Sequence, residues 1–159
     1  AGIGRGVLPL HVEGGAMNWW NVVHKGTKAA VRTADGHYSR QKPGTSQFTR
    51  PGKNLVLLGT DEKSVWVSWR PAVGGRMDNL DCYECVMYSR KSGPLASAQI
   101  KEAVAITEEF WGPPPKDGWI TFIKPGAVKS SNPGCCFKKA GWTPFGTNAN
   151  GNLLRLQLR

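Results

Sequence analysis

The hydrophobic residues of the chain fall into short runs separated by glycine, proline and polar residues, a pattern typical of a domain built around a sheet. Runs of strand length occur at 19–23, 54–58, 64–69, 80–89, 119–123 and 153–158. The tight polar turn at 60–63 joins the second run to the third. We therefore expect the runs between 54 and 89 to form an antiparallel meander.

One segment has clear helical periodicity. After Gly93 and Pro94, apolar residues recur on one side of a predicted helix, and Gly112 with three prolines ends it. Ser97 is expected either to cap this helix or to lie in its first turn. A second short helix is predicted over 134–140, with Asn132 as its cap, Pro133 at its first position and Gly141 in the left-handed conformation after it.

The N-terminal quarter is less regular. Residues 1–16 are rich in glycine and lack periodicity, so we interpret them as a leader or a remnant of an expression tag ahead of one domain over 17–159. A short helix is predicted up to residue 34. The polar stretch 35–52 is too long for an idle connection, which favours a functional loop.

The charge balance changes this picture of an ordinary domain. Twenty-one Lys and Arg against eleven Asp and Glu give a net charge of +10. Such an excess in a small protein favours a polyanionic partner, nucleic acid above all, although a generally basic surface would give the same count. The charges are scattered along the chain, so any basic patch must be assembled by the fold.

The apolar runs, the cysteines and the acidic residues narrow the class of protein further. No apolar run approaches the roughly 18 residues needed to cross a bilayer, so no membrane association is expected. The cysteines form two pairs, Cys82 with Cys85 and Cys135 with Cys136, without the spacing of common zinc motifs. We therefore expect buried thiols in a reducing cytoplasm and no metal. An acidic cluster suited to a metal-dependent nuclease would be Asp78, Asp81 and Glu84, but on one strand Asp81 would face away from the other two.

The stretch 87–104 has the strongest functional signal. It is interpreted as the end of a strand, a basic glycine-containing turn and the start of the long helix. Such a junction points backbone N–H groups and the positive end of a helix at one spot, which favours a phosphate. Arg90 and Lys91 stand at its rim. An ordinary strand-to-helix connection with solvated charges remains the alternative.

The order of these elements, with the turn Arg90-Lys91-Ser92-Gly93-Pro94-Leu95, resembles the C-terminal half of the GNAT acyltransferase fold. Members carry a [Q/R]-x-x-G-x-[G/A] turn here that holds the pyrophosphate of acyl-CoA, and this chain departs from it at Leu95. The resemblance implies an α/β (α+β) fold with a mixed central sheet of about six strands and helices on both faces. It also implies acetyl-CoA or another acyl-CoA as donor, held by Arg90, Lys91, Ser92, Gly93 and Ser97.

A narrower resemblance is to the Mom-like phage proteins of this superfamily, which modify adenine in DNA. It is carried by His37-Tyr38-Ser39, by Ala96-Ser97 and by the run NPGCCFKKAGW at 132–142. An acidic residue expected near 124–126 is replaced by Lys-Pro-Gly. The resemblance implies a transferase that modifies a base in double-stranded DNA within the cytoplasm of a bacterial host.

Roles for individual residues follow from that resemblance and from charge. His37, Tyr38 and Ser39 would act at the acceptor amine and the leaving thiolate, because an imidazole can take a proton near neutral pH. Contacts to DNA phosphates are expected from basic residues on the long loop and the short helix: Arg40, Lys42, Arg50, Lys138 and Lys139. Two alternatives stay open, an acyltransferase for a small amine or a protein and a non-catalytic nucleic-acid-binding domain. The sequence leaves the choice between monomer and homodimer open.

Overall fold

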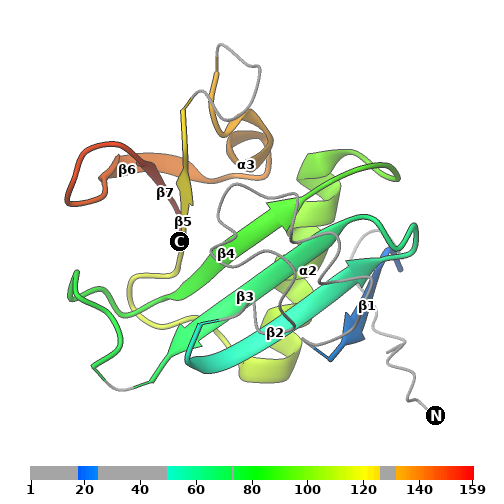
Figure 1. Cartoon of the computed structure of the whole chain (residues 1–159), viewed down its shortest axis with the longest axis horizontal. Helices are drawn as coiled ribbons and strands as arrows, with labels where there is room; N and C mark the ends of the chain where they lie inside the picture. The colour runs from blue at the N-terminus through cyan, green and yellow to red at the C-terminus, as the bar shows by residue number, and fades with distance from the viewer. Residues whose placement is uncertain (1–17, 25–49, 73, 126–131) are drawn as a thin grey trace.

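The computed structural model describes residues 18–24, 50–72, 74–125 and 132–159. These residues form one mixed sheet with two helices (Figure 1). The elements in chain order are β1 (Trp20–Val23), β2 (Gly52–Gly59), β3 (Val65–Pro71), β4 (Tyr83–Ser89), α2 (Ala96–Trp111), β5 (Trp119–Ile123), α3 (Cys135–Lys139), β6 (Thr143–Thr147) and β7 (Leu154–Leu158).

The sheet has seven strands in the order β1-β2-β3-β4-β5-β7-β6. Neighbouring strands are antiparallel except β4 and β5, which are parallel and are connected through α2. The mixed α/β class and the antiparallel meander from β2 to β4 are thus confirmed. The seventh strand, β6, was not predicted, because Pro144 and Gly146 interrupt its sequence in a way typical of a loop.

Some boundaries differ from the expected ones for local reasons. The fourth strand begins at Tyr83 rather than at residue 80, and Asp81 instead donates its backbone N–H to the Asp117 carboxylate. The short helix begins at Cys135 because Gly134, at φ +77°, is left-handed and cannot be helical. The predicted cap at Asn132 was therefore wrong. Gly141 has the expected positive φ, and Ser97 lies in the first turn of α2.

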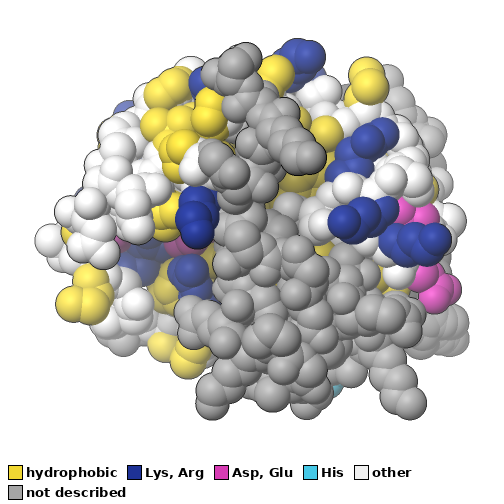
Figure 2. All heavy atoms as spheres, turned by 45° about the horizontal axis from the view of Figure 1, so that its top comes forward, with side chains coloured by type: hydrophobic (Ala, Val, Ile, Leu, Met, Phe, Trp, Pro, Cys, Tyr) yellow, Lys and Arg dark blue, Asp and Glu magenta, His cyan; other side chains and the backbone are white. Residues whose placement is uncertain are grey.

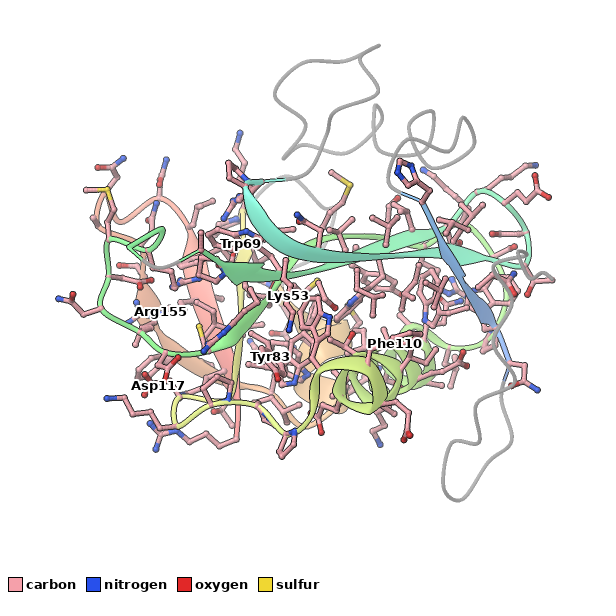
Figure 3. All side chains as sticks on the ribbon, turned by 90° about the horizontal axis from the view of Figure 1, so that it is seen from below. Lys53, Trp69, Tyr83, Phe110, Asp117 and Arg155 are labelled. Carbon is pink, nitrogen blue, oxygen red and sulfur yellow. The ribbon has the colours of Figure 1, made fainter. Side chains whose placement is uncertain are left out.

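The main hydrophobic core lies between the sheet and the two described helices. Ile100, Ala103 and Ile106 of α2 and Phe137 of α3 belong to this core together with Trp66 of β3, whose side chain is fully buried. Figure 3 shows the sheet nearly edge-on with α2 on one side, Tyr83 between the sheet and the helix, and Trp69 farther from the helix. The helix predicted before residue 34 lies outside the described residues, as do the expected leader and most of the long loop.

A bulge in β4 decides which side chains of that strand reach each face. Met87 pairs with Val67, and Cys85 pairs with Ser68, so Val86 has no partner on β3. The extra residue places Cys85 and Tyr88, three positions apart, on the same side of the sheet. Glu84 pairs with Trp69 and faces the other side. No helix in the described part of the chain is long and apolar enough to span a membrane.

Candidate functional site

The parallel strands β4 and β5 separate toward their carboxyl ends. Their pairing covers Tyr83 with Trp119 through Cys85 with Thr121 and stops there. Beyond this point β4 and β5 run apart as the two arms of a V (Figure 1). In α/β sheets, ligands characteristically bind outside the carboxyl ends of the strands. The opening between β4 and β5 is therefore a candidate ligand site.

The opening contains a small cavity of about 30 Å³. Its walls are the ends of the two strands, and Phe137 of α3 closes it. The hydroxyl of Thr121 donates to the Cys85 carbonyl at 2.8 Å, which holds the two strands together at the base of the V. A cavity of this size takes a thiol or a methyl group, but nothing larger unless the strands or Phe137 move.

The glycine-containing turn that follows β4 is tightly built. The Arg90 guanidinium donates to the carbonyls of Pro94 and Gly93, both at 2.9 Å. Gly93 has φ +90°, and a Cβ atom there would lie 2.5 Å from the Trp19 indole. Only glycine therefore fits at this position, and the exposed Arg90 side chain bridges the turn through its two hydrogen bonds.

The polar side chains around the turn are also engaged. Gln99 of α2 donates to the Ser92 and Pro94 carbonyls and accepts a hydrogen bond from Tyr88. Ser92 donates to Asp61 at 2.8 Å. Burial alone would raise the pKa of Asp61, but hydrogen bonds from Lys63, Ser92 and Ser64 lower it below its usual range. A carboxylate thus lies at the edge of the predicted anion site and partly offsets Lys91, which is exposed.

The start of α2 is open to an anion. No side chain caps it, and its first turn contains no acidic residue. The first N–H groups of an α-helix have no partner within the helix. Ser97 lies in this first turn, and Lys91 belongs to the turn that leads into it.

A second, larger cavity opens on the face of the sheet opposite α2. Its volume is about 270 Å³. Glu84 of β4 and Trp69 of β3 contribute from the sheet, with Arg50 and Arg76 from flanking segments and Phe122 from β5. Phe122 also lines the opening between β4 and β5, so the two cavities adjoin. Figure 2 shows a hollow on one face of the molecule with basic side chains beside it.

The electrostatics of this pocket centre on Glu84, whose side chain is 2% exposed. Its Oε1 accepts from Arg76 at 2.6 Å, and its Oε2 lies 3.4 Å from Arg50. Both guanidinium groups also lie over the Trp69 ring, at 5.0 and 5.6 Å from its centroid. Burial raises the pKa of Glu84, and the two arginines offset only part of that rise. A buried carboxyl with a raised pKa is a candidate general base.

The three acidic residues considered for a nuclease, Asp78, Asp81 and Glu84, do not form a common metal-binding cluster. Asp78 and Glu84 both pair with Arg76, whereas Asp81 pairs with Arg70 at 2.7 Å. Each of the three carboxylates is thus neutralised by an arginine. Among the described residues no group of three or more His, Cys, Asp or Glu side chains could hold a metal ion.

The structure brings together some of the predicted site residues. Arg90, Lys91, Ser92, Gly93 and Ser97 meet at the turn before α2, and Arg50 lies at the Glu84 pocket. Lys138 and Lys139 lie at the end of α3, where the Lys138 ammonium donates to Asn132. His37, Tyr38, Ser39, Arg40 and Lys42 lie outside the described residues.

The pocket around Glu84 was not predicted as a site. One signal was present: Glu84 is the single charged residue in an otherwise apolar strand core, YECVM. Its partners could not be found from sequence spacing, because Arg50 lies 34 residues away and Arg76 belongs to a loop.

Comparisons with known proteins identify no relative, since no family model, no curated protein and no solved structure matches this chain.

Proposed function

We propose that this protein is a GNAT-like transferase that moves an acyl group from an acyl-CoA donor to the amine of a nucleobase in DNA, most simply adenine. The observation that carries the proposal is the parallel pair β4–β5, which opens after Cys85 and Thr121 and is followed at once by the glycine turn of α2. The proposal takes the acyl-CoA donor and the DNA acceptor from the resemblance found in the sequence.

On the donor side, the thiol end of the donor would enter the opening between β4 and β5. Its phosphates would lie at the uncapped start of α2, beside Lys91 and Ser97. Arg90 would shape the turn through its bonds to Gly93 and Pro94 rather than contact the phosphates. Because the cavity is small, donor binding requires Phe137 to move or the strand ends to separate.

On the acceptor side, the pocket around Glu84 adjoins the opening through Phe122. The amine nitrogen would attack the thioester carbonyl carbon, forming a C–N bond while the C–S bond breaks. Glu84 would take the proton from nitrogen, and the released thiolate would take a proton from solvent. Arg76 would hold Glu84 in position through the bond at 2.6 Å.

Two properties support a nucleobase as acceptor. The pocket of about 270 Å³ lies just below the roughly 300–1,000 Å³ of sites for drug-sized molecules, which suits one planar base. Arg50 lies over Trp69, so a base could stack on the guanidinium plane, as bases do in single-strand recognition. The net charge of +10 would attract the DNA backbone.

The decisive experiment is mass spectrometry of nucleosides from DNA of cells that express the protein. An acylated or otherwise enlarged adenosine is expected, and only unmodified nucleosides would contradict the proposal. A thermal-shift measurement with acetyl-CoA tests the donor independently, because a ligand that binds the folded state raises its melting temperature.

The same two assays separate the alternatives. An acyltransferase for small amines or proteins would be stabilised by acetyl-CoA without salt-dependent binding to DNA. A non-catalytic DNA-binding domain would bind DNA and show no thermal shift with acetyl-CoA.

A further inference from the structure

Met77 is the most exposed large hydrophobic side chain of the described residues, at 97%. Single exposed hydrophobic residues are common and need no function. Two others occur here, Leu95 at 75% and Phe110 at 46%. Met77 is distinguished by its place, because it lines the same pocket as Glu84 and Trp69.

The segment that carries Met77 is held in a fixed shape. Arg76 donates from Nε and Nη2 to the two carboxylate oxygens of Asp78, at 2.9 and 2.6 Å. Asp78 also accepts the backbone N–H of Leu80. The hydrogen bonds between the Arg76 and Asp78 side chains link the two residues that flank Met77. Arg76 also donates from Nη1 to Glu84, so the segment that carries Met77 is linked to the buried carboxylate of the pocket.

This arrangement leaves an apolar side chain uncovered on a segment that is held in place. The hydrogen bonds of Arg76 and Asp78 order the residues on either side of Met77, while the Met77 side chain is 97% exposed and buries almost no apolar surface. Apolar surface of this kind gains free energy when a partner covers it, and a segment that is already ordered adds less ordering cost on binding.

We infer that Met77 is a wedge that enters the base stack of duplex DNA and displaces one nucleotide into the Glu84 pocket. The inference rests on the proposed function for its choice of DNA as partner. Methionine is among the side chains that proteins insert between base steps, and such insertion unstacks the step and bends the duplex. An enzyme that acts on a base must take it out of the stack. Here the wedge and the pocket are neighbours joined by one arginine.

The test measures base unstacking directly and does not depend on catalysis. Linear plasmid DNA, which offers many sequence contexts, is incubated with the full-length protein and then with chloroacetaldehyde, which attacks unpaired adenine and cytosine. The variants are Met77→Ala, Met77→Leu as the conservative replacement, and Phe110→Ala as the matched control at another exposed hydrophobic residue. Circular dichroism of each variant verifies the fold.

The wild type, Met77→Leu and Phe110→Ala are expected to raise reactivity at discrete bases, and Met77→Ala to lower that signal at least about fivefold at equal DNA occupancy. Equal signals from the wild type and Met77→Ala would overturn the wedge, as would wild-type protein that binds no DNA or unstacks no base. Failure of the proposed function gives a different result: unstacking that depends on Met77, without any acylated nucleoside in the DNA.

Discussion

The Glu84 carboxylate lies 2.6 Å from the Arg76 guanidinium, and these side chains are only 2% and 9% exposed. Burying an ion pair costs desolvation of both charges, and a well-packed apolar pair in its place is often as stable or more so. A buried pair of this kind is therefore weak evidence for stability, and under the proposed function its role is to hold the carboxylate that accepts the proton. It positions a carboxylate beside the separation of β4 and β5.

Replacing Glu84 by Gln should lower the rate of acyl transfer by about 10²–10⁴-fold, because the amide cannot accept the proton. The control is Asp81→Asn, which also removes a carboxylate from an arginine, here Arg70, but does not line the pocket. Steady-state kinetics should show near-normal turnover for that control. Equal losses in the two variants would mean that the loss comes from breaking an ion pair with arginine and not from the missing proton acceptor.

Replacing Gly93 by Ala should destabilise the protein by about 2–4 kcal/mol, since a positive φ and a close contact with Trp19 are combined at this residue. Gly151→Ala is the control, because Gly151 also has a positive φ, +75°, but no atom lies within 4 Å of the added Cβ. Urea unfolding should show a clearly smaller loss for the control. Similar losses would show that Trp19 moves aside without cost.

The buried carboxyl of Glu102 should make a contribution to stability that falls as pH rises. Burial raises its pKa in the folded state, despite hydrogen bonds from the backbone N–H groups of Trp20 and Trp19. The folded protein then holds this proton more tightly than the unfolded chain does. The contribution is fully present below the unfolded pKa and is lost as pH rises through the folded pKa.

The measurement for Glu102 is the free energy of unfolding of the wild type and of Glu102→Gln at a series of pH values. The difference, wild type minus variant, should decrease as pH rises from about 4.5 toward neutrality, since other groups cancel in the comparison. A difference that grows with pH would indicate that the hydrogen bonds to Trp19 and Trp20 outweigh burial.

Lys138 and Lys139 provide a test of the basic surface. If both contact phosphates, the double variant Lys138→Ala/Lys139→Ala should reduce the slope of log K against log salt concentration by about 1.8 for duplex DNA. Lys101→Ala on the exposed side of α2 is the control and should leave that slope unchanged. Fluorescence anisotropy at several salt concentrations gives these slopes. An unaltered slope in the double variant would show that these two lysines of α3 do not contact DNA phosphates.

Much of the fold followed from local patterns. The β2–β3 turn, the helix that ends at Gly112 and the buried run 119–123 all carry their own signals of hydrophobic spacing and turn residues. Strand β6 carries no such signal, because Pro144 and Gly146 are typical of a loop. It forms a strand through its pairing with β7, which overrides these local preferences. The class of fold was predictable from these local signals, whereas β6, at one edge of the sheet, was not.

The candidate site was predictable only in part. The turn after β4 has a local signature, and its residues do meet at the start of α2. The contact between Gly93 and Trp19 joins positions far apart in the chain, so the closed interior of the turn could not be foreseen. The Glu84 pocket depends on the register of β3 with β4 and on Arg50 and Arg76, none of which follows from spacing.

The unpaired Val86 in β4 has a consequence for how this strand tolerates change. Removing this one residue would restore regular alternation and would leave Tyr88 on the core side of the sheet and Glu84 on the opposite side. The strand is therefore expected to accept the loss of a residue at this point, whereas a one-residue deletion within its regular part, from Tyr83 to Cys85, would move side chains from one face of the sheet to the other.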